Sequence, residues 1–141
     1  MNERIDVGAW VDRYRRAWAT KDDEGIVDLF TPDAVYRSNP LAEPHVGRAA
    51  IAAYWRKATR TQQDLDLRFG APVVEGDRAT VEWWATMRDD DWYPAKDPSE
   101  GVTLPGCLVL TFAPDGRCAE LREYYNAAFG PLKTAPDGWG L

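Results

Sequence analysis

The spacing of apolar residues changes along the chain from a helical period to strict alternation, and this change limits the folds that the chain can adopt. From about Asp6 to Thr20, and again from Gly47 to Thr59, apolar residues recur three and four positions apart, which predicts amphipathic helices. After Thr59 they recur at every second position, and in Ala79–Arg88 they occupy one whole face, as in a half-buried strand. Helices followed by an antiparallel meander predict an α+β fold with the helices on one face of a sheet.

A short helix and a strand are predicted between these two helices. Asp22 or Asp23 can cap the helix, and Thr31-Pro32 should end it, because the residue before a proline avoids helical geometry. From Ala34 the pattern alternates as far as Asn39-Pro40, which predicts a strand. A strand held between two helices suggests one wall and the lid of a cavity.

The C-terminal half reads as a loop, a hairpin and a tail. The segment Asp89–Gly101 is too acidic and proline-rich for a strand, and it is long enough to form a functional flap. Val102–Phe112 and Arg117–Asn126 should pair as a hairpin. Residues 127–141 form a tail rich in glycine and proline, and we expect the whole of 1–141 to be one domain. The candidate anchors of the tail are Phe129, Leu132 and Trp139.

The acidic charge balance argues against two classes of partner. The chain holds 17 Lys and Arg against 23 Asp and Glu, a net charge of −6. Nucleic acids and anionic membranes are bound mainly through Lys and Arg, so neither is expected as a partner. No uncharged apolar run is long enough to span a bilayer, and residues 1–4 lead into a charged helix without the pattern of a signal peptide. We therefore expect a cytoplasmic protein.

The two cysteines and the single histidine predict neither a disulfide nor a metal site. Cys107 and Cys118 flank the turn of the predicted hairpin and should lie about 13 Å apart along its strands, which is too far for a disulfide. Free thiols fit a reducing compartment. Two cysteines and one histidine do not make a zinc site, and we expect no cofactor.

Glu123 is a candidate functional residue, because the strand pattern places it on an apolar face together with Leu121 and Tyr125. Burial raises the pKa of a carboxyl group, and a raised pKa suits a general acid or base that works near neutral pH. The alternative is structural, since a buried carboxylate can also pair with an arginine or cap backbone amides. The strand pattern leaves both interpretations open.

Two segments, DDEGIVDLFTPDAVY and HVGRAAIAAYW, resemble the NTF2-like superfamily in its SnoaL-like (polyketide cyclase-like) branch. The resemblance runs from Val7 to about Phe129. It implies a cone-shaped, cystatin-like α+β fold in which a strongly curved antiparallel sheet wraps around three N-terminal helices and a deep apolar pocket. It also implies a homodimer that packs through the outer sheet face, where Trp84, Thr86 and Arg88 are predicted to lie.

The chain is distantly similar to the ketosteroid isomerases, but it keeps only part of their catalytic set. Their oxyanion-hole tyrosine falls on Tyr14. Their proton-shuttling aspartate falls on Ser38, and their protonated oxyanion-hole aspartate falls on Leu108. A ketosteroid isomerase without its base is not the expected activity.

A distant similarity to the limonene-epoxide hydrolases gives a different partial match. Their water-positioning tyrosine falls on Tyr36 and its asparagine partner on Ser38. The arginine and aspartate of their central strand become Trp83 and Ala85. Their last aspartate, and also the catalytic aspartate of the polyketide cyclases, falls on Glu123, which is the residue that the strand pattern selects independently.

Aromatic residues provide the rest of the predicted pocket, although stripes of this kind also form ordinary cores. Tyr54 belongs to this aromatic set. His45, in a proline-rich loop, is either a pocket acid/base or a solvated or capping residue. The substrate-binding candidates are Trp18, Ser38, His45, Trp55, Trp83, Met87, Leu108 and Tyr125.

These residues favour a cofactor-independent isomerase, cyclase or lyase that acts on a hydrophobic small molecule. Glu123 would be its general acid/base, and Tyr36 or Tyr14 would polarise a substrate oxygen. A non-catalytic ligand-binding or accessory protein is the main alternative. A further alternative is a hydrolase of the epoxide-hydrolase type with a degenerate triad. Another is a protein that binds peptides, because one fold serves many functions.

Overall fold

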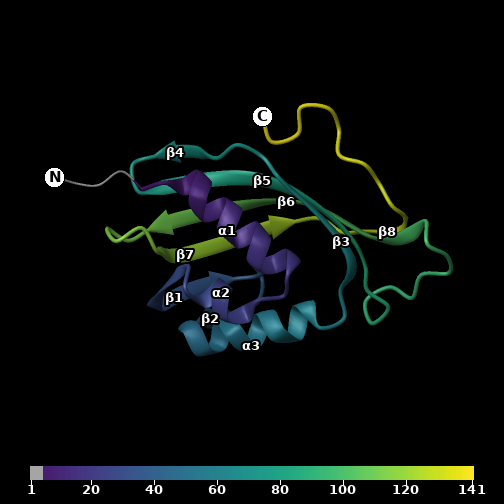
Figure 1. Cartoon of the computed structure of the whole chain (residues 1–141), viewed down its shortest axis with the longest axis horizontal. Helices are drawn as coiled ribbons and strands as arrows, with labels where there is room; N and C mark the ends of the chain where they lie inside the picture. The colour runs from purple at the N-terminus through teal and green to yellow at the C-terminus, as the bar shows by residue number, and fades with distance from the viewer. Residues whose placement is uncertain (1–4) are drawn as a thin grey trace.

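A computed structural model describes residues 5–141, so residues 1–4, on which the expectation about a signal peptide rests, lie outside the described part. The described chain forms three helices and an eight-stranded sheet (Figure 1). The elements are α1 (Val7–Ala19), α2 (Asp23–Val27), β1 (Phe30–Arg37), β2 (His45–Val46), α3 (Arg48–Thr59), β3 (Gln63–Phe69), β4 (Val73–Glu75), β5 (Arg78–Arg88), β6 (Glu100–Phe112), β7 (Cys118–Tyr125) and β8 (Ala128–Pro131).

The sheet has the strand order β2-β1-β7-β6-β5-β3, and it does not close into a barrel. β4 pairs with β5, and β8 pairs with β6. All these pairings are antiparallel except the one between β1 and β7, which is parallel. The expectation of a purely antiparallel sheet is therefore wrong in this one pairing. Only the tertiary fold can bring these two strands together, because strands β2 to β6 lie between them in the sequence.

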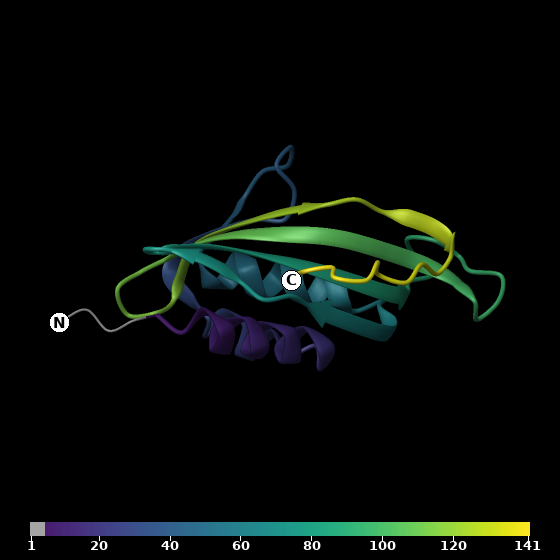
Figure 2. The ribbon, with the colours of Figure 1, turned by 90° about the horizontal axis from the view of Figure 1, so that it is seen from above.

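The helices lie on one side of the sheet, and helices and sheet together form the α+β cone expected of the NTF2-like fold (Figure 1). α1 crosses the sheet, while α3 lies beside β1 and β2 (Figure 1). Seen from above, the loop between β1 and β2 projects from the side opposite the helices (Figure 2). None of the described helices is long and apolar enough to cross a membrane.

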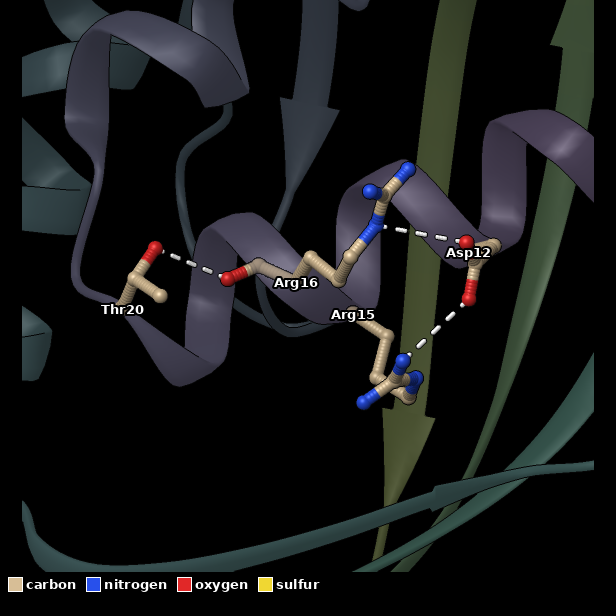
Figure 3. Close-up of polar contacts among 4 residues, drawn as sticks. All are labelled: Asp12, Arg15, Arg16 and Thr20. Carbon is tan, nitrogen blue, oxygen red and sulfur yellow. Dashed lines mark hydrogen bonds and ion pairs between the residues drawn. The ribbon is translucent and has the colours of Figure 1, made fainter.

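Helix α1 has the two faces that its apolar spacing predicts. Asp6 caps it, since its carboxylate accepts a hydrogen bond from the Ala9 N–H at 2.9 Å. On the solvent side, Asp12 pairs with Arg15 and with Arg16, at 3.2 Å each (Figure 3). Such exposed pairs contribute only tenths of a kcal/mol, so the helix is held mainly by its buried face. That face consists of Val7, Trp10, Val11, Tyr14, Ala17 and Trp18.

Helix α2 is shorter than its apolar spacing predicts. Asp22 caps it, but it ends at Val27, and β1 already begins at Phe30. Thr31-Pro32 therefore lies inside the strand rather than at the end of the helix. Phe30 pairs with Cys118 of β7, and the register shifts between Phe30 and Val35. A proline is tolerated at such an irregularity, where it removes no regular ladder hydrogen bond.

The C-terminal tail is more ordered than a glycine- and proline-rich segment suggests. It adds β8 to the edge of β6 and then returns across the outer face of the sheet. The Trp139 ring packs edge-on against Trp84 at 5.2 Å, and the Trp84 indole N–H donates to the Lys133 carbonyl at 2.9 Å. The tail thus covers the tryptophan that the sequence placed in a homodimer interface, and an interface on this face must lie beside the tail.

Both cysteines are free. Cys107 lies opposite Tyr124 and Cys118 opposite Phe112, so the hairpin register differs slightly from a simple two-residue turn. A turn one residue longer, closed by the Ala113 N–H to Arg117 carbonyl bond, gives part of the difference, and the register shift between Thr111 and Phe112 gives the rest, because a bulge adds one residue to one strand.

Candidate active site

A cavity of about 860 Å³ opens between α3, the end of α1 and the inner face of the sheet. Seven of the eleven residues that the sequence nominated line it, although they come from distant parts of the chain. Aromatic side chains dominate its wall, as expected for a pocket that takes an apolar molecule. The seven residues are Trp18, Tyr36, His45, Trp55, Trp83, Glu123 and Tyr125.

Four nominated residues do not line the cavity. Met87 and Leu108 belong to the hydrophobic core, because the apolar faces of β5 and β6 continue beyond the cavity wall. Tyr14 is also fully buried, behind Tyr36. Ser38 follows the end of β1 and is not part of the cavity wall.

Glu123 is held in the cavity wall by the register of β7. It pairs with Leu108 of β6, and its neighbour on the same face, Tyr125, pairs with Gly106. Only 7% of Glu123 is exposed. The ion pairs found among residues 5–141 all involve other carboxylates, so the structural alternative of a buried arginine partner is not observed.

Burial in this apolar wall raises the pKa of Glu123 to about 8, and the Tyr36 hydroxyl beside it lowers that pKa only in part. The cause is desolvation, because a carboxylate loses its hydration shell in the cavity wall while a neutral carboxyl group loses much less. At neutral pH the side chain is therefore mostly a protonated carboxyl group, which can donate a proton or a hydrogen bond.

Three tyrosines gather around Glu123. The hydroxyl groups of Tyr14 and Tyr36 are 3.1 Å apart and share a hydrogen bond. Burial raises the pKa of both, as it does for Tyr54, and the nearby Glu123 raises all three further. All three phenols are therefore neutral donors near pH 7. Tyr36 and Tyr54 line the cavity, whereas Tyr14 reaches the site only through Tyr36.

His45 reaches the cavity through the short strand β2. It is the cross-strand partner of Tyr36, and its ring packs against Tyr54 with centroids 4.5 Å apart. Burial lowers the pKa of the His45 imidazole, so the ring is mostly neutral at neutral pH. The structure therefore places His45 in a strand and against the cavity, rather than in a solvated loop.

Tryptophan rings form the opposite wall. Trp18 lies edge-on to Trp55 at 5.6 Å and to Trp83 at 5.5 Å. The Trp18 indole N–H donates to Gln62 at 2.9 Å, which fixes the ring. Gly106 lies flat against Trp83, because a Cβ atom at this position would come within 2.2 Å of the indole. This glycine is thus required by the close approach of the ring.

The sequence did not nominate several other residues of the wall. Gln62 and Asp89 are polar residues near strand and helix ends, and both are buried. Trp92 belongs to the 89–99 loop, so that loop does border the cavity. The sequence could have indicated Asp89 and Trp92 as cavity residues, because they belong to an acidic loop that follows an apolar strand. Nothing in the local pattern indicates Gln62.

The arrangement combines a protonated carboxyl group, phenol donors and a neutral imidazole in one apolar cavity. These groups can exchange protons with a bound molecule and stabilise a negative oxygen. Among residues 5–141, no three His, Cys, Asp or Glu side chains lie close enough together to hold a metal ion.

Comparisons with known proteins agree with this fold. The chain is similar to the epoxide hydrolase/cyclase-like enzyme SalBIII, which acts in pyran ring formation in the polyether salinomycin, with 22% identity, a TM-score of 0.72 and coverage of 89% of this chain and 95% of that chain. It is also similar to a Sinorhizobium meliloti protein assigned as a polyketide cyclase, with 27% identity, a TM-score of 0.59 and coverage of 82% and 94%. A Catenulispora acidiphila protein with a ketosteroid isomerase-like fold is 17% identical, with a TM-score of 0.70 and coverage of 83% and 85%.

None of the curated proteins compared with the chain is significantly similar to it in sequence. The sequence model of the SnoaL-like domain, in contrast, matches residues 11–121, which include most of α1, all of α2 and α3, and most of the sheet. Because this match covers most of the chain and agrees with the fold and the cavity, the chain belongs to the SnoaL-like domain family of the NTF2-like superfamily.

Proposed function

We propose that this protein is a cofactor-independent enzyme that binds a hydrophobic small molecule and transfers a proton to one of its oxygen atoms from Glu123. The observation that carries the proposal is the buried carboxyl group of Glu123, which faces an aromatic cavity and has no cationic partner among residues 5–141. An unpaired buried acid costs stability, and such a cost is typical of functional sites.

In this proposal each residue near Glu123 has a separate role. Glu123 is the general acid, because its pKa of about 8 keeps it protonated at neutral pH while leaving it easily ionised. The Tyr36 hydroxyl is a second donor toward the same substrate oxygen. Tyr14, which does not line the cavity, is a positioning residue that orients the Tyr36 hydroxyl through their hydrogen bond. The aromatic wall holds a flat apolar molecule.

Proton transfer of this kind supports isomerisation, cyclisation and elimination. In each case the substrate oxygen gains negative charge as electrons move, and a donor placed beside it lowers the barrier. The structural neighbours include a cyclase-like enzyme and a ketosteroid isomerase-like fold, which supports this reaction class for the chain as a proposal.

A flat hydrophobic ketone provides a direct test. In deuterated buffer at neutral pH, proton NMR would follow loss of the α-protons of 2-tetralone in the presence of the wild type and of Glu123→Gln. Exchange with the variant should be at least 100-fold slower, since a positioned acid contributes about 10² to 10⁴ in rate. Glu120→Gln is the matched control, because Glu120 lies on the same strand and pairs with Arg122 instead of facing the cavity.

A non-catalytic binding protein would give a different result with the same probe. Calorimetry would then show saturable binding of 2-tetralone with a negative heat-capacity change, while wild type and Glu123→Gln would exchange the α-protons equally slowly. That combination would refute the enzymatic proposal.

We also propose a homodimer that packs through the outer face of the sheet, beside the C-terminal tail. Leu41, in the loop that projects from this side, is 96% exposed, and Tyr124 of β7 is 44% exposed. Exposed apolar side chains that gather in one patch are typical of interaction sites. They border a groove of about 790 Å³ that also includes Trp139 of the tail.

A further inference from the structure

We infer that His45 is the second proton-transferring residue of this site, and that it removes a proton from a substrate bound between itself and Glu123. The inference rests on the proposed role of Glu123 and adds the residue that completes the reaction. A general acid alone protonates an oxygen, but an isomerisation also requires a group that accepts a proton from carbon or from a hydroxyl.

The first argument is the position of His45 in the sheet. β2, β1 and β7 are neighbouring strands, with His45 opposite Tyr36 and Tyr36 opposite Leu121. Glu123 follows two residues after Leu121 on the same face of β7. With a strand spacing of about 4.8 Å and a rise of about 3.3 Å per residue, the Cα atoms of His45 and Glu123 lie about 12 Å apart.

This separation suits two side chains that act on one molecule from two sides. Both side chains line the same cavity, so they extend toward the space between them. The polar atoms of an imidazole and of a carboxyl group reach at most about 5 Å from their Cα atoms, so a gap remains between the two groups in which a small substrate can contact both. The ring of Tyr36 lies between the two groups and forms the floor of this space, with its centroid 6.3 Å from that of His45.

The second argument is the protonation state of the two groups. Burial lowers the pKa of His45 and raises the pKa of Glu123, so at neutral pH the imidazole is free to accept a proton and the carboxyl group has one to give. When their surroundings move the pKa values of two groups in opposite directions, the group with the lowered pKa can act as the base and the group with the raised pKa as the acid. Tyr36 of β1 and Tyr54 of α3 contact the His45 ring, and both are neutral phenols.

The remaining ionisable groups of the cavity do not change this assignment. Lys57 and Arg60 of the α3 end carry positive charge, while Asp91 carries negative charge, and all three are exposed to solvent, which screens them. The other ionisable groups that line the cavity are Tyr125, a phenol whose pKa burial raises, and Asp89, whose buried side chain accepts a hydrogen bond from the Trp92 N–H at 3.3 Å.

The proposed step balances for a ketone. The C–H bond next to the carbonyl breaks and its proton goes to His45. The electron pair of that bond forms the C=C bond, and the carbonyl π electrons move to oxygen. The O–H bond of Glu123 breaks and its proton goes to that oxygen, so the products are an enol, an imidazolium and a carboxylate. The imidazolium exchanges its proton for a deuteron from the solvent. When the step runs in reverse, this deuteron goes to the carbon atom, and no oxidant, metal or cofactor is needed.

The test compares α-proton exchange in 2-tetralone by four forms of the full chain. These are the wild type, His45→Gln, Glu123→Gln and the double variant. Each single variant should exchange at least 100-fold more slowly than wild type. The double variant should be no slower than the slower single variant, because two groups that act in one step are not additive. His45→Phe keeps the ring contact with Tyr54 and should be as slow as His45→Gln, so a merely structural role of the ring is distinguished from a base.

The pH profile gives a readout that folding defects do not produce. Exchange by the wild type should fall below the pKa of His45 and above pH 8, where Glu123 ionises. His45→Gln should lose the acidic limb alone, and Glu123→Gln the alkaline limb alone. His45 is the single histidine of the chain, so one imidazole NMR signal reports its titration directly.

The outcomes separate this inference from the proposed function. If Glu123→Gln is slow while His45→Gln and His45→Phe exchange like wild type, the role of His45 is refuted and that of Glu123 stands. If wild type exchanges no faster than buffer, both are refuted. The wild-type imidazole signal should show a second inflection near pH 8, where Glu123 ionises, and Glu123→Gln should lack it. If wild type shows no such inflection, or if it persists in Glu123→Gln, the two groups do not act on one molecule and the inference fails.

Discussion

Replacing Glu123 with glutamine should make the free energy of unfolding less dependent on pH. In the folded wild type the carboxyl group keeps its proton up to about pH 8, whereas an exposed glutamate in the unfolded chain loses it near 4.5. Between these two values folding takes up a proton, so the stability of the wild type falls as pH rises. Glutamine is neutral at every pH and has nearly the same shape, so Glu123→Gln lacks this fall.

The magnitude follows from the two pKa values. The difference between 4.5 and about 8, at about 1.4 kcal/mol for each pH unit, corresponds to about 5 kcal/mol. Below the lower value the carboxyl group is neutral in both states and costs nothing. Above the higher value it is charged in both states, and the folded protein carries the full desolvation cost. The stability of Glu123→Gln relative to wild type should therefore rise by about 5 kcal/mol between about pH 4 and pH 9.

Urea unfolding of both proteins at several pH values measures this difference directly. Other carboxylates titrate equally in both proteins and cancel, and Glu120→Gln should follow the wild-type curve above pH 5 because its carboxylate lies outside the cavity. A stability difference between Glu123→Gln and wild type that changes by less than about 1 kcal/mol over this range would refute a buried, desolvated carboxyl group. Carboxylate NMR that places the Glu123 pKa at or below 4.5 would do the same.

Three further predictions concern the surroundings of the site. Gly106→Ala places a methyl group 2.2 Å from the Trp83 ring, so chemical denaturation should show a loss of about 1–3 kcal/mol, and wild-type stability would contradict the close packing. Tyr14→Phe removes the buried partner of the Tyr36 hydroxyl at 3.1 Å and should cost about 1–2 kcal/mol in the same assay; no loss would mean that the hydroxyl finds another partner. The wild type should sediment near twice 15.9 kDa and Leu41→Glu as a monomer, whereas a monomeric wild type at micromolar concentration would remove the proposed interface.

The sequence predicted correctly which segments are helices and which are strands wherever buried residues recur at a regular spacing. The stripe of Val7, Val11, Tyr14 and Trp18 is buried along α1, and the apolar face of β5 is buried from Ala79 to Met87. The inward phase of Glu123 also follows from alternation, and the structure confirms that this residue is buried. Periodicity succeeds here because it reports which side of an element meets the core.

The same reasoning failed where a local preference was overruled by a distant contact. Leu29 and Phe30 continue a helical spacing, yet their backbone meets Cys118 of β7, and strand pairing replaces the helix. The glycines and prolines of the tail suggest a loose segment, but β6 offers an open edge to β8, and Trp84 offers a surface to Trp139. Neither partner is visible within a local window of sequence.

By itself the sequence determined the order of helices and strands, the resemblance to the NTF2-like superfamily and the burial of Glu123, because each depends on residue types at regular local spacing. Only the tertiary structure decided that β1 pairs in parallel with β7, that His45 and Glu123 line one cavity, and that Tyr14 lies behind it. These facts depend on which segments meet after folding. A side chain's neighbours across a sheet set its solvation and its pKa, and such neighbours, like Tyr36 and Leu121, lie far apart in the chain.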